Sequence, residues 1–292
     1  MLIAVNGQRI ESSYLPAVVH LLTLLQEKNI KILVAPALQQ ALNNAGYPVE
    51  LFTNLPENTD YLISIGGDGT FLESVLLVGQ SGTPVLGINT GRLGFLSNIT
   101  LDDPEKTISY LLEKNYTLEE RSLVKVSGNF LPVGDIPYAL NEIGIQKRLP
   151  TMMINIKVSI NGEKLPDYWA DGLLVSTPTG STAYSMSIRG PIIVPDVHCL
   201  LLSPIASHNL STRPLVIDDR STIKMQVNTR QHTAIISLDN RFYEVPSGTE
   251  ISVAKADFTV KTVRLHGSSF FSTLQEKLLW GSDKRNAPSL NL

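Results

Sequence analysis

A glycine-rich segment between a strand and a helix constrains the fold of this chain more than any other feature. Residues 66–70 read Gly-Gly-Asp-Gly-Thr; they follow the apolar run of residues 61–65 and precede the helical pattern of residues 71–78. A strand, a glycine turn and a helix in this order are typical of α/β folds, in which helices cover a mostly parallel sheet. Eight of the 20 glycines lie between Gly66 and Gly94, which is more than packing alone requires.

The remaining pattern divides the chain into two parts. Its 292 residues exceed the roughly 100 to 200 residues of a typical single domain. In the first part, strands are expected at residues 2–5, 31–35, 49–52, 61–65 and 84–88. Later runs alternate apolar and polar residues, and Ser272 with Gln275 forms a capping-box pattern for a last helix. We therefore expect an α/β domain over residues 1–100 plus 267–292 and a β-rich domain over residues 101–266.

Composition narrows the range of partners. Charged residues make up 17% of the chain, against a usual share of about 25%, and hydrophobic residues 43%, so a disordered chain is excluded. The 24 basic and 27 acidic residues lack the basic excess of a nucleic-acid-binding protein, and no apolar run is long enough to span a membrane. The single cysteine, Cys199, cannot form an intramolecular disulfide, which fits a cytoplasmic location. Anionic ligands must therefore be bound by local groups.

Residues 66–70 have the chemistry of an anion site. Their backbone N–H groups converge at a helix N-terminus, where the helix dipole favours negative charge and glycines admit a phosphate without Cβ clashes. We expect Gly66, Gly67, Gly69 and Thr70 to form a phosphate cradle. Asp68 would repel a phosphate unless it takes a proton or binds a cation, and both roles belong to phosphoryl transfer. The structural alternative is that Asp68 caps the helix or stabilises a tight turn.

Three further segments concentrate polar groups. Residues 177–184 (TPTGSTAY) either bind a polar ligand, with Tyr184 against a planar base, or form a hydroxyl-rich turn and cap. Asn141-Glu142 interrupts an apolar run; shared ligand contact would need a strand end or bulge, and solvation at a sheet edge is slightly favoured. Asp171 is either a solvated turn carboxylate or a ligand acceptor. The five histidines have no zinc-site spacing, so metal ligands stay unknown.

Together these segments, in this order and spacing, resemble the NAD kinase family. The resemblance extends to Gly87-Ile88-Asn89, Gly91-Arg92-Leu93-Gly94-Phe95-Leu96, Asp171-Gly172-Leu173 and Arg213-Pro214-Leu215-Val216, and so covers roughly residues 60–245. The Gly-Gly-Asp-Gly-Thr motif by itself also resembles that of diacylglycerol and sphingosine kinases and of the phosphofructokinase-like group.

The resemblance implies both a fold and a reaction. The fold is a phosphofructokinase-like α/β N-terminal domain, a β-rich C-terminal domain that binds NAD, and a last helix that returns to the first domain. The reaction is transfer of the γ-phosphate of ATP to the 2′-hydroxyl of the adenosine ribose of NAD, giving NADP, with Asp68 as general base. Magnesium or another divalent cation and a dimer or tetramer are implied too. Polyphosphate as donor and NADH as acceptor stay open.

The resemblance also implies which residues bind NAD. Asn141 and Glu142 would hold its ribose and diphosphate, and Asp171 its nicotinamide carboxamide. The other expected contacts are Asp68, Gly69, Thr182, Ala183, Tyr184, Ser185, Met186, Ser187 and Ala206. Two positions depart from the family pattern: Trp169, where many relatives have a basic residue, and Arg241, where a neutral amide is common.

Two other functions remain in competition. One is a lipid kinase with the same glycine-aspartate motif, which is disfavoured because no basic amphipathic helix or long apolar segment marks a membrane face. The other is a non-catalytic dinucleotide sensor, which has no need of a base in its phosphate cradle.

Overall fold

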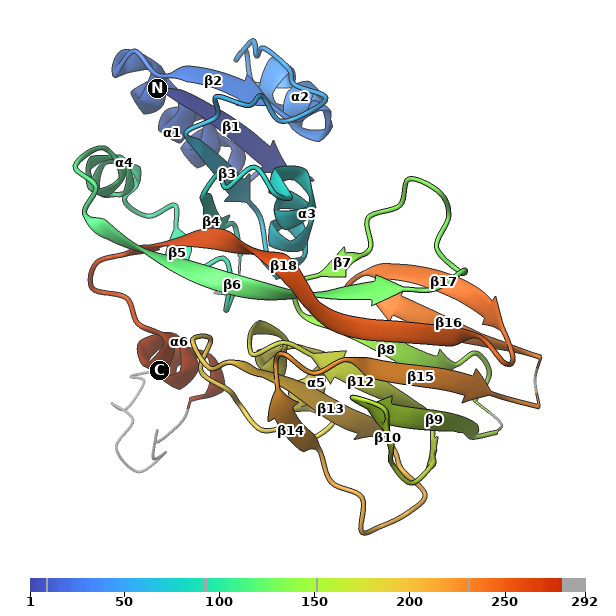
Figure 1. Cartoon of the computed structure of the whole chain (residues 1–292). Helices are drawn as coiled ribbons and strands as arrows, with labels where there is room; N and C mark the ends of the chain where they lie inside the picture. Colours follow the sequence, from blue (N-terminus) through green and yellow to red (C-terminus); the bar gives the residue numbers. More distant parts are fainter. Residues whose placement is uncertain (9, 92–93, 151, 231, 280–292) are drawn as a thin grey trace, which may run out of the picture. The chain divides into compact units, whose positions relative to one another are not determined.

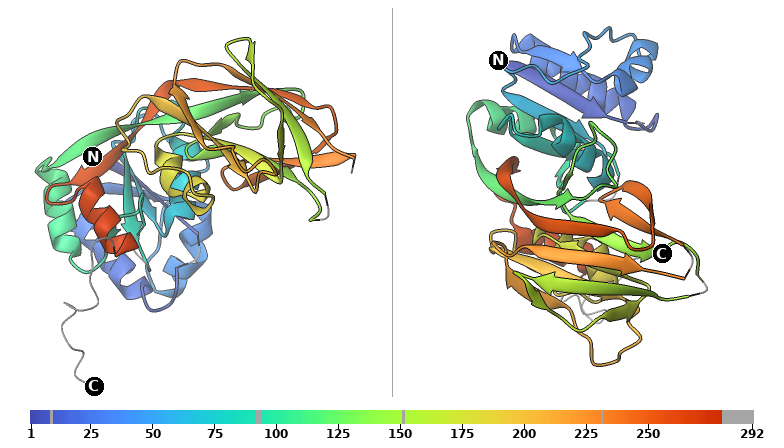
Figure 2. Two further views of the ribbon diagram at one scale, coloured as in Figure 1. Left: turned by 90° about the horizontal axis from the view of Figure 1, so that it is seen from below. Right: turned by 45° about the vertical axis from the view of Figure 1, so that its right-hand side comes forward.

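The chain forms two compact units (Figure 1). The structure is a computed structural model that describes residues 1–8, 10–91, 94–150, 152–230 and 232–279. Unit 1 consists of Met1–Glu119 and the segment from Lys261 onward, and unit 2 is Glu120–Val260. Residues 280–292 of the expected first domain lie outside the described residues. Strands β6 (Tyr116–Ser127) and β18 (Glu250–Leu265) lie side by side and run from one unit into the other (Figure 2).

Unit 1 is built on parallel strands covered by helices. Its further strands are β1 (Leu2–Gly7), β2 (Lys31–Val34), β3 (Tyr61–Ile65), β4 (Val85–Asn89) and β5 (Ile99–Thr100). Its helices are α1 (Leu15–Glu27), α2 (Pro36–Asn44), α3 (Asp68–Val78), α4 (Pro104–Leu112) and α6 (Phe270–Leu278). The strand order is β4-β3-β1-β2, so the chain places β2 on one side of β1 and β3 on the other. The switch point of the sheet therefore lies between β1 and β3. Ligands of open α/β sheets bind at the carboxyl ends of the strands at such a switch point, which here includes the turn after β3.

The core of unit 1 follows the strand periodicity. Alternate residues of neighbouring strands, such as Ile3, Ile63 and Leu86, join one buried apolar cluster with Leu21 of α1 and Leu38 of α2. Because side chains of a strand alternate between the two faces, this spacing buries one face of the sheet against the helices.

Unit 2 is a sandwich of two mostly antiparallel sheets. In one, the order is β10-β9-β15-β18, with β11 beside β9 and β6 between β18 and β7; in the other it is β14-β13-β12-β8-β16-β17. The first sheet adds β7 (Tyr138–Ala139), β9 (Ile154–Ile160), β10 (Glu163–Lys164), β11 (Tyr168–Ala170) and β15 (Ile223–Asn228). The second comprises β8 (Glu142–Lys147), β12 (Gly172–Ser176), β13 (Cys199–Ile205), β14 (Leu215–Asp218), β16 (Thr233–Leu238) and β17 (Arg241–Pro246). Inward side chains of both sheets, such as Ile145 and Ile156, form its core.

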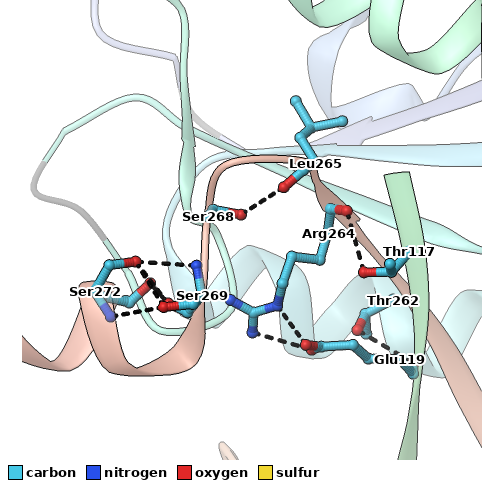
Figure 3. Close-up of polar contacts among 9 residues, drawn as sticks. Thr117, Glu119, Thr262, Arg264, Leu265, Ser268, Ser269 and Ser272 are labelled. Atoms are coloured by element: carbon cyan, nitrogen blue, oxygen red, sulfur yellow. Dashed lines mark hydrogen bonds and ion pairs between the residues drawn. The ribbon is translucent and has the colours of Figure 1, made fainter. Parts of the chain in front are cut away.

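The predicted fold class is confirmed, but two local predictions were wrong. Residues 49–52 were expected to form a strand, but only Leu51 pairs, in an isolated bridge with Val34. Their neighbour at the edge of the sheet, β2, is only four residues long, which leaves little length for pairing. The last helix begins at Phe270, and its capping box joins Ser269 with Ser272, not Ser272 with Gln275 (Figure 3). In addition, α4 was not predicted, although Asp103 caps it through the N–H of Lys106 at 2.9 Å.

A buried ion pair joins β6 to β18 within unit 1 (Figure 3). The Arg264 guanidinium donates to both carboxylate oxygens of Glu119, and the Arg264 side chain is only 9% exposed. Beside this pair, the Thr262 hydroxyl donates to the Glu119 carbonyl at 3.3 Å, and the Thr117 hydroxyl to the Arg264 carbonyl at 3.5 Å. The ion pair therefore holds the two strands together where they leave unit 1.

Glu119→Ala is expected to destabilise the protein, because it leaves the buried Arg264 guanidinium without its carboxylate. Breaking a buried ion pair from one side costs about 3 kcal/mol or more. Glu50→Ala is the matched control, since Glu50 and Lys31 are 69% and 61% exposed and such a pair contributes less than about 1 kcal/mol. Urea unfolding should separate the two variants; equal midpoints would contradict the assignment.

Candidate active site

The turn after β3 leads directly into α3. Gly67 is the N-cap residue and Asp68 the first residue of the helix, and none of the described side chains caps it. The N–H groups of the first turn are therefore free of side-chain caps, at the positive end of the helix dipole. A Cβ placed on Gly67 or Gly69 would have no atom within 4 Å. The space beside these two glycines leaves room for an anion.

The carboxylate of Asp68 is held by the loop of residues 94–97, which follows β4. Its Oδ2 accepts the N–H of Phe95, and its Oδ1 accepts those of Leu96 and Ser97, each at 3.0 Å. Charge-assisted bonds of this kind are stronger than neutral ones, so three of them fix the orientation of the carboxylate. Asp68 does not cap α3, so that alternative is wrong; its carboxylate does stabilise a turn, in the neighbouring loop.

The loop of residues 94–97 is shaped to fit around Asp68. A Cβ on Gly94 would lie 2.0 Å from Asp68 Oδ1, so no other residue allows this approach. The Ser97 carbonyl accepts the N–H of Gly94 at 2.9 Å and the side-chain amide of Asn89 at 3.2 Å. The motif from Gly87 to Leu96 thus builds the wall of the Asp68 site; its Arg92 and Leu93 lie outside the described residues.

A second carboxylate organises unit 2 in the same way. Asp239 lies at the turn between β16 and β17 with φ +50°, and it accepts the N–H groups of Leu140, Asn141 and Glu142 at 2.8, 2.8 and 3.1 Å. Asn141 and Glu142 are only 8% and 9% exposed. Solvation at a sheet edge, the interpretation favoured for this pair, is therefore wrong, since both side chains are buried at the start of β8.

Asp239 is an organising residue that the sequence prediction missed, although an acidic residue directly after an apolar strand was an available signal. Arg241 was noted only as a departure from the family pattern. The Arg241 guanidinium donates to the carbonyls of Ile136 and Tyr138. Arg241, which departs from the family pattern, therefore has a structural role: its hydrogen bonds fix the segment that leads to Asn141.

Glu142 is buried beside Asp239, and one of its carboxyl oxygens has no hydrogen-bond partner among the described residues. Its Oε2 is inaccessible to solvent and has no hydrogen-bond partner in the described structure. Burial, with a further contribution from the Asp239 carboxylate, raises the pKa of Glu142 to about 8. Burial raises the pKa of Asp239 too, but the three N–H groups and Arg241 oppose that rise. Glu142 is therefore the member of the pair that carries a proton at neutral pH.

The hydroxyl-rich segment after β12 mostly bonds to the protein itself. Thr177 donates to the Leu140 carbonyl at 2.6 Å and accepts the N–H of Gly180 at 3.1 Å. A Cβ on Gly180 would lie 2.1 Å from the Asn141 carbonyl, so this segment packs tightly against the Asn141 backbone. The buried Ser185 hydroxyl bonds to Ser203 at 3.2 Å. These hydroxyls shape the site, as the turn alternative for residues 177–184 predicted.

The remaining expected NAD contacts are distributed along β12. The short helices η1 (Thr179–Thr182) and α5 (Tyr184–Ser187) follow its carboxyl end, where the Tyr184 ring is 38% exposed. At its other end Asp171 pairs with Lys147 at 2.6 Å, and its N–H donates to the carbonyl of Ile205, next to Ala206. The partially or fully exposed members are Asp171, Thr182, Ala183, Tyr184, Met186, Ser187 and Ala206.

The structure does not bring Asp171 close to Asn141 and Glu142. In the pairing of β8 with β12, Glu142 lies opposite Ser176 and Gln146 lies opposite Gly172. The five residues of β12 span about 16 Å, at about 3.3 Å per residue. The two ends suit an extended ligand better than a compact one.

The described residues contain neither a cluster of metal ligands nor a membrane-spanning helix. No group of three or more His, Cys, Asp or Glu side chains within them could hold a metal ion. None of the described helices is long and apolar enough to cross a membrane.

An open helix N-terminus with an oriented aspartate beside it is an arrangement that suits a phosphotransferase. Comparisons with known proteins specify which kind. The family model for the ATP-NAD kinase N-terminal domain matches residues 1–116, and that for the C-terminal domain matches residues 140–265. The NAD kinase of Flavobacterium psychrophilum is 40% identical over 98% of this chain and 100% of that protein. The NAD kinase of Bacteroides fragilis is 44% identical over 81% of each.

Solved structures give the same result. Yeast NADH kinase, solved with NADH, is similar with a TM-score of 0.86 and 25% identity over 99% of this chain and 90% of that one. An NAD kinase from Archaeoglobus fulgidus, solved with ATP, has a TM-score of 0.73 and 26% identity over 96% and 99%. This chain belongs to the NAD kinase family and is a kinase enzyme. The lipid kinase and the non-catalytic sensor have no support among these relatives.

Gly69→Ala should separate ligand binding from stability. Alanine is favoured over glycine inside a helix by roughly 0.5 to 1 kcal/mol, so the melting temperature should stay equal or rise. The added methyl group would occupy the open space of the cradle, and KM for the phosphate donor should increase about 10-fold or more. Gly66→Ala is the contrast, because its φ is +150° and its Cβ would lie 2.4 Å from Thr70 Oγ1; this variant should lose stability. Unchanged kinetics in Gly69→Ala would exclude the cradle.

Glu142 should make stability depend on pH. Its pKa of about 8 lies above the ordinary value of 4.5, so between these values only the folded state holds the proton. The free energy of unfolding should therefore fall as pH rises from about 5 to 8, by up to about 1.4 kcal/mol per pH unit. Glu142→Gln should flatten this dependence in urea titrations at several pH values, and the exposed control Glu163→Gln should follow the wild type. Parallel curves for all three proteins would contradict the raised pKa.

Proposed function

We propose that this chain transfers the γ-phosphate of ATP to the 2′-hydroxyl of the adenosine ribose of NAD, giving ADP and NADP, with Asp68 as general base. A bond forms between the ribose oxygen and the γ-phosphorus while the bond to the leaving ADP oxygen breaks, and the hydroxyl proton passes to Asp68. One observation carries the proposal: Asp68 is held in a single orientation by three N–H groups, beside an open glycine cradle.

Asp68 keeps the capacity to accept a proton. A carboxylate oxygen has two acceptor positions, and Oδ2 uses only one of them, for the N–H of Phe95. A ribose hydroxyl is a poor nucleophile at neutral pH, so a base at a fixed position lowers the barrier. The N–H groups that fix Asp68 thus serve the reaction by orientation.

The cradle supplies the electrostatic part of catalysis. The N–H groups of Gly67, Gly69 and Thr70 lie at the N-terminus of α3. Such preorganised dipoles would stabilise the charge that develops on the transferred phosphoryl group. Gly66 contributes by letting the chain turn from β3 into the helix at a φ of +150°.

We assign NAD binding to the two ends of β12. The amide of Asn141 and the protonated carboxyl of Glu142 would hold the ribose and diphosphate, where a neutral Glu142 spares the diphosphate a second negative charge. Asp171 would accept from the nicotinamide carboxamide, with Lys147 fixing its carboxylate. Tyr184 offers an exposed ring to a planar base, with Thr182, Ala183, Met186, Ser187 and Ala206 around it. Ser185 is fully buried and bonded to Ser203, so it would support these residues from behind.

A divalent cation would enter this site together with the donor phosphates. The described residues contain no cluster of three or more acidic, histidine or cysteine ligands, and Asp68 is the carboxylate nearest the cradle that could help to hold magnesium. Such an ion neutralises donor phosphate charge. We expect this chain to work in the cytoplasm, which its single cysteine fits, and to form a dimer or tetramer, as the family resemblance implies.

Asp68→Asn should lower kcat by about 10²- to 10⁴-fold, because the amide cannot take a proton. It should also lower the melting temperature, because the amide cannot accept all three N–H groups that the carboxylate holds. NADP formation should be measured with ATP or polyphosphate, NAD or NADH, and magnesium. Asp103→Asn is the matched control, because Asp103 also accepts a backbone N–H in unit 1, at the start of α4. Full activity of Asp68→Asn would overturn the role of the base; no NADP from the wild type with any pair of substrates would overturn the reaction.

A further inference from the structure

Two side chains of helix α6 contact Phe95, a residue of the loop that holds Asp68. The Phe270 ring lies 6.5 Å from the Phe95 ring, and Lys277 Nζ lies 4.7 Å from the centre of the same ring. Phe270 and Lys277 are seven positions apart, about two helical turns, so both project from one face of α6. Phe271 packs edge-on against Phe270 at 5.8 Å and supports it.

Phe95 connects this contact to the carboxylate. Its ring is held by α6, while its N–H donates to Asp68 Oδ2 at 3.0 Å. This oxygen is the one with an acceptor position left for a substrate proton. A displacement of the Phe95 backbone would therefore change the direction in which Asp68 faces its substrate.

The start of α6 is fixed independently of Phe95. Ser269 and Ser272 form its capping box, and Thr273 and Leu274 are buried at 5% and 4% exposure (Figure 3). Lys277, by contrast, lies on the exposed part of the helix. An exposed cation–π contact contributes only about 0.5 to 1 kcal/mol to stability, so the fold does not depend on it.

We propose that Lys277 and Phe270 are positioning residues for catalysis: they hold Phe95, and through its N–H they set the orientation of Asp68. The inference rests on the proposed role of Asp68 as base. It assigns a catalytic purpose to α6, whose residues are more than 170 positions away from Asp68 in the sequence.

The test compares Lys277→Met, which keeps the apolar stem, with Lys277→Arg, which keeps a cation over the ring. Lys277→Met should lower kcat about 2- to 5-fold, the largest factor by which an exposed cation–π contact can bias the orientation of Phe95, with both KM values and the melting temperature nearly unchanged. Lys277→Arg should restore most of kcat. The control is Lys106→Met, which removes a similar contact, 5.7 Å from Nζ to the Tyr110 ring, on α4 of the same unit; it should behave as wild type.

A double-mutant cycle tests the route through Phe95. In a Phe95→Leu background, Lys277→Met should have no further effect on kcat, because the ring that Lys277 contacts is gone. Equal effects of Lys277→Met in both backgrounds, wild-type kcat for Lys277→Met, or an equal loss in Lys106→Met would each overturn the inference. Asp68→Asn separates this from the proposed function: if that variant is inactive while Lys277→Met is normal, only the positioning role fails, and if it is fully active, both fail.

Discussion

The site depends on one interaction, the acceptance of three successive backbone N–H groups by the Asp68 carboxylate. The loop of residues 94–97 takes its shape from these bonds, and Asp68 takes its orientation from the loop. Gly94 is needed because Asp68 Oδ1 lies within 2.0 Å of where its Cβ would be, and Asn89 holds the Ser97 carbonyl that closes the turn. Replacing Asp68 would therefore affect both the proposed base and the loop that surrounds it.

Unit 2 uses the same device around Asp239. There too a carboxylate accepts three successive N–H groups, and the held segment carries Asn141 and Glu142. A buried carboxylate is stable only when its charge is met, and backbone N–H groups meet it without adding a side chain to the site. The negative charge of Asp239 helps to raise the pKa of the neighbouring Glu142, whose carboxyl therefore stays protonated. In each unit, an acidic side chain thus fixes the backbone of a segment distant in sequence.

How much the sequence predicted depends on how local each signal is. Strands β1 to β4 and the Gly66–Thr70 turn were predicted because their apolar periodicity and turn chemistry lie within a few residues. The contact of Asp239 with residues 140–142 joins positions 97 to 99 apart, and no periodicity reports such a distance. The same holds for α6 and Phe95. The solvated-edge interpretation of Asn141-Glu142 failed for this reason, since it considered their own strand and not the turn that covers them.

The low charge of the chain is compatible with a highly charged substrate because of where the compensating groups lie. A net charge of -3 and a 17% share of charged residues provide no basic surface. The described cradle offers N–H dipoles in place of side-chain cations, and dipoles fixed by the fold need not be reoriented when the phosphate arrives. Glu142 acts in the same direction, because its raised pKa removes a negative charge from the segment assigned to the diphosphate. Under the proposed function, the protein would therefore bind phosphate with few charged side chains and many oriented backbone groups.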